Sequence, residues 1–195
     1  MNFDSGIHLL KESGLNIFLS EKVSSLPENI FNFSKEQKNK MLCLIGHGGK
    51  KLWENIPDHN IENPIDNFSL KKMHEFASVS LDGDIEILFP DDRFILPLQK
   101  LSRVFNFSTQ SPLGMDISRD YGLWFAVRGV FLTKAKIPLL SAPLQGFPCD
   151  DCHTKPCLKA ATIDEGRLVC PIKIEHQYSP EQLKYHHKAL KNLKN

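Results

Sequence analysis

The apolar segment Tyr121–Leu132 restricts the possible folds more than any other part of the chain. Arg128 is its one charged residue. Side chains of a β-strand alternate between two faces. One face is therefore predicted to carry Trp124, Ala126, Arg128 and Val130, and the other Phe125, Val127, Gly129 and Phe131. Because both faces are mainly apolar, the segment is predicted to be a central strand that is buried on both sides.

Arg128 needs a partner in such a strand, because burial of an unpaired guanidinium is unfavourable. Two interpretations follow. Arg128 either pairs with a carboxylate in the core or binds an anionic group of a ligand. A turn signal, Ser111-Pro112 with Gly114, precedes the strand.

The composition excludes several classes of protein. A chain of 195 residues with 41% hydrophobic residues fits one domain, or one domain with a small appendage. A net charge of +1 argues against general nucleic-acid binding. No apolar run reaches the roughly 20 residues that span a bilayer, and the first residues lack the pattern of a signal peptide. We therefore expect a cytoplasmic protein that does not bind membranes.

Helices and strands are predicted to interleave. Helices are expected at Asp4–Ser13, Leu52–Ile56, Pro64–Ser80 and Pro97–Phe107, and strands at Leu15–Leu19, Met41–Ile45 and Ile85–Phe89. The segment Ser24–Lys40 is expected to be a loop with a helical turn, and Leu81–Asp84 a turn. Because the connections are irregular, an α+β fold is favoured over a doubly wound sheet.

The end of the chain carries a clear helix signal. Ser179 is a predicted N-cap, Pro180 follows it, and Gln182 is placed to complete a capping box. A stripe of side chains is expected to dock this helix, formed by Leu183, His186 or His187, Leu190 and Leu193. The lysines of this region more simply form a solvated face than a nucleic-acid patch.

A glycine-rich segment follows the strand at Met41–Ile45, with the sequence Gly46-His47-Gly48-Gly49-Lys50-Lys51. Backbone amides between a strand and a helix can bind an anion. The glycines can equally serve only to permit a tight turn. His47 is an additional candidate ligand contact, and His47, Tyr121 and Asp116 are candidate proton donors.

Four of the five cysteines lie close together in sequence: Cys149, Cys152, Cys157 and Cys170, the last followed by Pro171. In a reducing compartment a disulfide framework is not expected. Closely spaced cysteines with a distant Cys-Pro are typical of a 4Fe-4S site. Zinc is the alternative metal, and unligated thiols are the remaining interpretation.

The segment Gly114–Val130 resembles the signature of the CblC-type cobalamin-processing proteins, approximately G-x-x-I-H-P-x-x-G-x-W-F-A-x-R-G-V. The matching positions are Gly114, Ile117, Gly122, Trp124, Phe125, Ala126, Arg128, Gly129 and Val130. Elements further upstream match more loosely. The family's His-Pro is replaced by Ser118-Arg119.

The cysteine-containing region is similar to a second group, the epoxyqueuosine-reductase-like iron–sulfur proteins. In that group there are two ferredoxin-like motifs, and each cluster is bound by three cysteines of one motif and by the Cys-Pro cysteine of the other. Cys149, Cys152 and Cys157 correspond to the first motif, and Cys170 to the Cys-Pro of the second. Ala161 stands where the other Cys-Pro cysteine would fall. The resemblance therefore implies one complete ligand set and the loss of the other cluster.

These resemblances imply a nitroreductase-like core with a sheet flanked by helices at residues 1–140, and a small cysteine-rich lobe with a final helix at 141–195. The implied cofactor is a corrinoid, with FMN as an alternative. Arg128 would contact an anionic group of the ligand, and Trp124 would pack on its flat face. The other expected contacts are Gly114, Asp116, Gly46, His47 and Gly48.

The implied function is an iron–sulfur oxidoreductase in which one 4Fe-4S cluster supplies electrons to a corrinoid, acting with a redox partner protein and a small-molecule substrate. No catalytic residue is assigned. Two alternatives remain. One is a corrinoid-binding or electron-transfer module without a substrate of its own, and the other is a structural protein in which zinc crosslinks the loop from Cys149 to Cys170.

Overall fold

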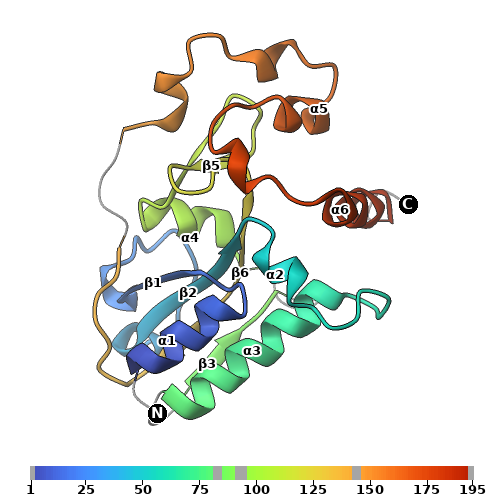
Figure 1. The fold of residues 1–195 in the computed structure, drawn as a ribbon. Coiled ribbons are helices and arrows are strands. Elements are labelled where there is room, and N and C mark those ends of the chain that lie inside the picture. The colour runs from blue at the N-terminus through green and yellow to red at the C-terminus, as the bar shows by residue number, and fades with distance from the viewer. Residues whose placement is uncertain (1–2, 81–84, 91–95, 142–145, 193–195) are drawn as a thin grey trace.

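The computed structural model describes residues 3–80, 85–90, 96–141 and 146–192, with side chains as far as residue 186. Its central feature is an antiparallel four-stranded sheet of order β1-β2-β6-β3 (Figure 1). The strands are β1 (Ile17–Lys22), β2 (Met41–Gly48), β6 (Phe125–Thr133) and β3 (Ile85–Leu88). Helices flank the sheet, so the predicted α+β class is confirmed.

The two faces of the sheet are covered by different helices. Helices α1 (Phe3–Glu12) and α3 (Pro64–Ser80) cover one face, where Leu10, Met73 and Phe76 pack against Phe131. Helix α4 (Leu98–Val104) covers the other face, where Leu101 belongs to the same apolar cluster as Val130 and Leu132. Helix α2 (Lys51–Glu54) is a single turn after β2. Strand β6 is thus an interior strand buried on both sides, as predicted.

The predicted alternation of β6 fails at one point, because a β-bulge interrupts the strand. Ile45 pairs with Gly129 but Gly46 pairs with Val127, which leaves Arg128 without a partner in the register. A bulge inserts one extra residue and turns the strand over locally. Phe125 and Val127 therefore pack on the same apolar cluster as Val130, whereas Arg128 faces α3. The predicted sharing of one face by Arg128 and Val130 is wrong for this reason.

Several elements differ in extent from the prediction. Strand β2 continues through Gly46 and His47 to Gly48, so the predicted turn starts only at Gly49. Helix α4 ends before Phe107 because Asn106 adopts a left-handed conformation, with φ of 57°. The predicted turn at Leu81–Asp84 lies outside the described residues.

A two-stranded hairpin follows α4 and was not predicted. It pairs β4 (Ser108–Gln110) with β5 (Asp116–Ser118). Asp116 accepts hydrogen bonds from Arg103 Nε at 3.0 and 3.2 Å and from Ser108 Oγ at 2.9 Å. A salt bridge to α4 therefore fixes this hairpin, which is too short to be recognised from alternation of side chains.

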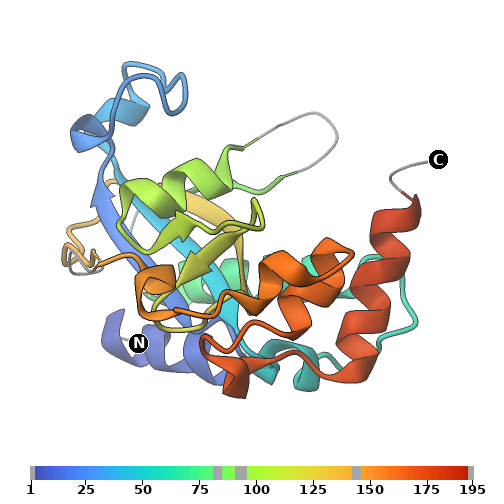
Figure 2. The same cartoon turned by 90° about the horizontal axis from the view of Figure 1, so that it is seen from above.

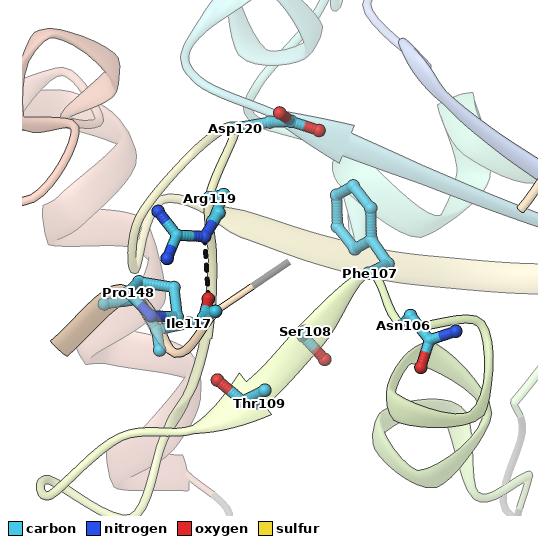
Figure 3. A pocket seen from close by; sticks show the side chains of 9 residues that line it. Asn106, Phe107, Ser108, Thr109, Ile117, Arg119, Asp120 and Pro148 are labelled. Atoms are coloured by element: carbon cyan, nitrogen blue, oxygen red, sulfur yellow. Dashed lines mark hydrogen bonds between the residues drawn. The ribbon is translucent and has the colours of Figure 1, made fainter. Parts of the chain in front are cut away.

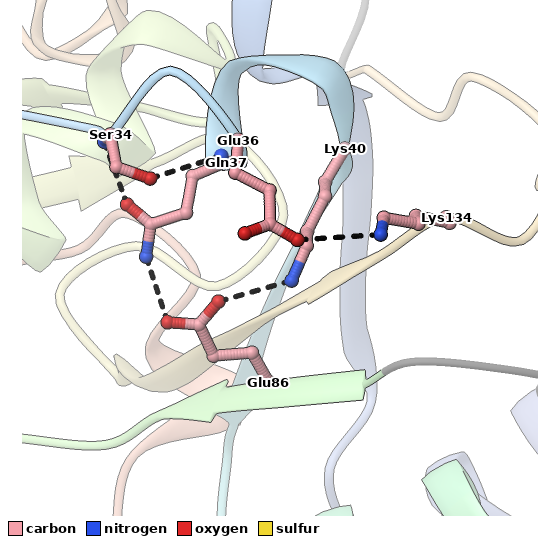
Figure 4. Close-up of polar contacts among 6 residues, drawn as sticks. All are labelled: Ser34, Glu36, Gln37, Lys40, Glu86 and Lys134. Atoms are coloured by element: carbon pink, nitrogen blue, oxygen red, sulfur yellow. Dashed lines mark hydrogen bonds and ion pairs between the residues drawn. The ribbon is translucent and has the colours of Figure 1, made fainter.

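The polar segment before β2 is a loop with the 3-10 turns η1 (Val23–Ser25) and η2 (Gln37–Asn39), as predicted, and its polar side chains form an ordered corner (Figure 4). The Lys40 side chain, 5% exposed, reaches Glu86 of β3 at 3.2 Å, and Gln37 Nε2 donates to the same carboxylate at 2.7 Å. Lys134, which follows β6, pairs with Glu36 at 3.3 Å. These polar contacts tie the corner to β3 and to the chain beyond β6, at the end of the sheet opposite His47.

Residues 146–192, here called the C-terminal segment, lie at the end of the sheet where β2 ends and β6 begins (Figures 1 and 2). They form short 3-10 turns η3 (Pro148–Asp151), η4 (Pro156–Lys159) and η5 (Ile174–His176), and helices α5 (Ile163–Leu168) and α6 (Pro180–Asn192). Helix α5 was not predicted, although its N-cap is recognisable in the sequence: the Thr162 side chain accepts a hydrogen bond from Glu165 N.

Helix α6 begins where it was predicted, and Gln182 N donates to Ser179 Oγ at 3.2 Å. The Gln182 side chain, however, does not complete a capping box. It is fully buried and makes no hydrogen bond. No helix in the described residues is both long and apolar enough to cross a membrane.

Candidate functional site

A group of aromatic and polar side chains lies between the sheet and the C-terminal segment; Arg167 and His186 are half-buried, and the other members are buried. We call it the seam. The sheet side supplies His47 of β2 and Trp124, and the C-terminal segment supplies Arg167, Tyr178, Gln182 and His186. Gln182 joins this group because it stands one helical turn before His186 on α6, and therefore on the same face.

The rings of the seam form a column. His47 and Tyr178 stack with centroids 5.8 Å apart and planes 18° apart, and Tyr178 stacks on His186 at 5.4 Å and 25°. Trp124 meets Tyr178 edge-on at 5.5 Å. Tyr178 is thus the central ring, and it separates the sheet side of the seam from α6.

Arg167 closes one side of the column. Its Cζ lies 4.5 Å from the Trp124 ring and 4.8 Å from the Tyr178 ring, which is cation–π geometry. Nη2 donates to the Leu123 carbonyl at 2.9 Å. Burial lowers the pKa of Arg167.

Many polar atoms of the seam are buried without a hydrogen-bond partner. They are both ring nitrogens of His47, Nε1 of Trp124, Nε of Arg167, and both amide atoms of Gln182. Buried polar groups in folded proteins are almost always hydrogen-bonded, and each exception needs an explanation. Such a concentration at one place indicates a site completed by water or by a polar ligand.

His47 is uncharged in this setting. Its side chain is fully buried, and burial lowers its pKa well below the ordinary value. The positive charges of Arg128, His186 and Arg167 act in the same direction. The Gly49 backbone lies beside the ring without forming a normal hydrogen bond to either nitrogen. His47 therefore keeps an unprotonated nitrogen at neutral pH.

The end of β2 holds His47 rigidly. The Asn16 side chain accepts from Gly48 N at 2.7 Å and donates to Gly48 O at 3.0 Å. Gly49 N donates to the Trp124 carbonyl at 2.8 Å. Because the backbone is anchored on both sides, His47 and Trp124 keep a constant spacing.

Arg128 lies next to the seam with only a weak partner. Its Nη1 is 3.6 Å from Asp66 Oδ1, too long for a hydrogen bond, and the two side chains are 20% and 49% exposed. A loose ion pair at this exposure contributes little. A carboxylate partner thus exists, but it leaves most of the guanidinium's donors available. Burial raises the pKa of Tyr178 and of Tyr185, and the charge of Arg128 opposes that rise.

The predicted cofactor residues fall into two groups. His47, Trp124 and Arg128 come together at the seam. Trp124 is completely buried, so a ligand reaches its ring only if Arg167 or Tyr178 moves. In the described part of the chain, no hydrogen bond, ion pair or ring contact links Asp116 to these three residues; Arg103 and Ser108 hold it instead.

Two of the three predicted glycines, Gly46 and Gly48, are needed for close chain packing. Gly114 has φ of 78° at the hairpin tip and faces open space. A Cβ at Gly46 would lie 2.8 Å from the Ala126 carbonyl oxygen, and one at Gly48 would collide with the Tyr121 ring. Because Gly46 and Gly48 are strand residues, the glycine-rich turn expected there is not formed. Their contact with a cofactor remains a prediction.

Two cavities lie away from the seam. One of about 20 Å³ is bounded by the hairpin and by Arg119, whose Nε donates to the Gly146 carbonyl at 2.7 Å (Figure 3). It has room for about one water molecule. The other, of about 300 Å³, lies under the polar corner beside Leu26 and Phe33. Neither is lined by the predicted cofactor residues.

The four cysteines are gathered in the C-terminal segment. Cys149 and Cys170 are buried beside Ile117 and Leu123, and Cys152 and Cys157 are half-buried. Burial, together with the neighbouring thiols Cys170, Cys157 and Cys152, raises the pKa of Cys149 to about 11. Burial likewise raises the pKa of Cys170.

The donor chemistry of these thiols fits a soft metal or an iron–sulfur cluster, since a cation would offset both effects. Among the residues that the structure describes, however, no three or more Cys, His, Asp or Glu side chains are positioned to hold a single metal ion. The predicted ligation by the four cysteines therefore remains a prediction.

Only His47 and Trp124 of the six seam residues were predicted as site residues. Arg167, Tyr178, Gln182 and His186 were not, although His186 was expected in the docking stripe of the last helix, and the support from Asn16 was not predicted either. One signal was present, because Tyr178 stands immediately before the N-cap Ser179, where a large apolar side chain often packs. Nothing in the sequence pairs Arg167 with Trp124, since helix α5 brings them together.

Comparison with known proteins gives a likeness of fold. No protein-family model and no curated protein matches the sequence. The crystal structure of the B12-trafficking protein CblC of C. elegans, a homologue of human MMACHC, superposes with a TM-score of 0.59 at 15% identity, covering 94% of this chain and 91% of that one. At this identity the likeness establishes a related fold.

The structure of epoxyqueuosine reductase from Streptococcus thermophilus gives a TM-score of 0.47 at 13% identity. The match covers 82% of this chain and 52% of the reductase, so the chain spans about half the length of that enzyme.

Proposed function

We propose that this protein binds a corrinoid at the seam, carries one 4Fe-4S cluster on its four C-terminal cysteines, and acts in one-electron redox chemistry. The observation that carries the proposal is the seam itself. Its buried donors and acceptors have no partners in the protein, and they line a wall containing Trp124 and Arg128. The likeness of fold to a B12-trafficking protein favours a corrinoid as the missing group.

The residues at the seam suit such a ligand. A corrinoid presents a flat conjugated ring with polar amide groups around its edge. Trp124 and Tyr178 offer aromatic surface, Gln182 offers an unpaired amide, and Arg128 offers donors for an anionic group. The corrinoid would supply the redox chemistry when bound, and these side chains would position it and exclude water.

Cys149, Cys152, Cys157 and Cys170 would hold the cluster. Their mutual destabilisation as thiolates would be relieved by iron. The cluster would transfer electrons singly from a redox partner protein. Zinc in its place would leave a corrinoid-binding protein without an internal electron donor.

The cluster is tested by composition and by substitution. Anaerobically purified protein is expected to be brown and to contain about four irons and about four sulfides per chain. Cys152→Ser should remove most of the iron, because it deletes one ligand. Cys43→Ser is the matched control, since Cys43 is buried in the sheet core away from the set. Colourless protein with one zinc per chain would contradict the cluster.

The corrinoid is tested by titration with hydroxocobalamin. Binding should shift the corrin absorption spectrum. Arg128→Met should raise the dissociation constant roughly tenfold or more, because a hydrogen bond to a charged group is lost. Arg119→Met is the control, since that guanidinium bonds the Gly146 carbonyl and Asp151 instead. An unchanged spectrum in the wild-type protein would refute corrinoid binding.

A further inference from the structure

The C-terminal segment is attached to the core unevenly along its length. Its earlier part contacts the backbone of the core directly. Arg167 Nη2 donates to the Leu123 carbonyl at 2.9 Å. Ile172 lies so close to Gly122 that a Cβ added to Gly122 would collide with the Ile172 carbonyl. The segment is therefore fixed to the core at least as far as residue 172.

The last part of the segment, residues 177–192, has no such anchor. We call it the arm; it consists of the link Gln177–Ser179 and helix α6. Between Gln177 and Tyr185, no backbone hydrogen bond in the described structure reaches the sheet. Helix α6 lies at the margin of the molecule in both views, and it does not run along another of the described helices or strands (Figures 1 and 2). Side chains therefore hold the arm in place.

Two tyrosine rings supply much of this attachment. Tyr178 stacks on His47 with centroids 5.8 Å apart, and its ring lies 4.8 Å from Cζ of Arg167. Tyr185 packs against Trp53, the buried ring of α2, with centroids 5.4 Å apart. Ring contacts of this kind are favourable but individually modest.

The same position of the arm leaves polar atoms without partners. Gln182 of α6 is fully buried, and neither atom of its amide forms a hydrogen bond. Beneath the arm, both ring nitrogens of His47 are in the same condition. Water would satisfy these atoms if the arm moved away. Ring packing and the burial of polar groups thus oppose each other, so the arm can leave the sheet without unfolding it.

We propose that the arm is a lid that opens at the link Gln177–Ser179 and uncovers His47 and the edge of Trp124, while the sheet and the earlier part of the segment stay in place. A ligand can reach these side chains only when the lid is open, so its observed affinity is reduced by the fraction of open molecules. This control of access rests on the proposed function, whereas the opening itself requires no ligand.

Acid should favour the open lid. Tyr178 covers His47, and burial together with the charges of Arg128, His186 and Arg167 lowers the pKa of the imidazole. Opening returns the ring to water, where the ordinary pKa is about 6.5. Below that pH the open state binds a proton that the closed state does not, so opening should increase by up to about tenfold per pH unit.

Modification of His47 by diethyl pyrocarbonate at pH 7.5 tests the lid in the ligand-free protein. The reagent acylates exposed, unprotonated imidazole nitrogens, and mass spectrometry identifies the modified residue. His153, at an exposed loop position, is the internal reference. We expect His47 to react at least about tenfold more slowly than His153, because only the open molecules react, while the amides of β6 stay protected from hydrogen exchange.

Gln182→Met is the decisive variant. Methionine matches glutamine in length and helix propensity but has no amide, so the closed lid no longer buries these unpaired atoms and His47 should react at least about fivefold more slowly. Tyr178→Ala should accelerate the reaction at least about tenfold, because the covering ring is lost. Gln37→Met, at the polar corner where Gln37 bonds Glu86, is the matched control and should leave the rate unchanged.

Hydrogen exchange gives an independent measure of opening. A helix of 13 residues is marginal on its own in water, so the amides of α6 should exchange when the lid opens. After correction for the intrinsic effect of pH, their exchange should increase between pH 7 and pH 5.5 in the wild type and stay constant in His47→Phe.

The outcomes separate the lid from the proposed function. An unreactive His47 in both the wild type and Tyr178→Ala, or equal rates in the wild type and Gln182→Met, would refute the lid. Loss of protection in β6 at the rate of the His47 reaction would show unfolding of the whole sheet and also refute it. These measurements contain no corrinoid, so failure of the hydroxocobalamin titration would refute the proposed function and leave the lid standing.

Discussion

Several residues at the seam are not arranged for stability. An unpaired buried polar group costs roughly 1–3 kcal/mol, and His47 and Gln182 are both buried in this way. In a permanent interface such groups would have partners or be replaced by apolar residues. Their retention here is consistent with a seam that exchanges its internal packing for contacts with a bound molecule.

The protonation of His47 leads to a prediction for the ligand-free protein. Because its folded pKa lies well below its unfolded pKa, the unfolded state binds the proton more readily. Stability should be unaffected above pH about 6.5 and should fall as the pH drops below it, by up to about 1.4 kcal/mol per pH unit. Tyr178 covers the ring, and the charges of Arg128 of β6, His186 of α6 and Arg167 of α5 act on it.

Urea unfolding between pH 7.5 and pH 5 measures this effect. His47→Phe should flatten the part of the pH dependence that begins near pH about 6.5. His153→Phe, at an exposed loop position, should leave it unchanged. An identical acid dependence in wild type and His47→Phe would contradict the buried neutral imidazole.

At the level of elements, two irregularities of the backbone build the site. The bulge at Arg128 turns a strand that is otherwise regular, and so directs the guanidinium toward α3 and the seam. In the turn before β6, Gly122 adopts φ of 59° and lies against the backbone of Ile172. This close approach places the C-terminal segment beside Trp124.

A pair of glycine substitutions tests this contact. Gly114 and Gly122 both have positive φ, but Gly114 faces open space whereas a Cβ at Gly122 would collide with the Ile172 carbonyl. Gly114→Ala should lower the free energy of unfolding by about 1 kcal/mol, the cost of the left-handed conformation. Gly122→Ala should cost at least about 2 kcal/mol more, because of overpacking against the backbone. Equal losses in denaturant titrations would show that the segment is not packed there.

For the whole molecule, the seam is the joint between a sheet core and the C-terminal segment. Figure 2 shows the two parts in contact at one end of the sheet, while the corner tied by Lys40 and Glu86 lies at the other. A ligand at the joint would contact both parts at once. It should therefore stabilise them together, although they are distant in sequence.

Hydrogen exchange tests this coupling. Hydroxocobalamin should slow amide exchange in residues 46–49 and in residues 177–186, because one molecule contacts both. Residues 34–40 are the internal control and should exchange at the same rate with and without the corrinoid. Protection of only one of the first two ranges would place the ligand outside the joint.

The elements that depend on local patterns could be predicted from the residues alone. The apolar run of β6 required an interior strand, the Pro64 helix followed from its spacing, and Ser179-Pro180 set the start of α6, since these signals act within a few residues. The same run, through its resemblance to a known signature, also pointed to Trp124 and Arg128.

The tertiary structure alone decided how these residues meet. Alternation could not reveal the bulge at Arg128, because the extra residue depends on the register with β2. Nor could it place Tyr178 against His47 or Arg167 against Trp124, since those contacts join parts of the chain more than 40 residues apart. Local preference forms the strands and helices, whereas long-range packing forms the site.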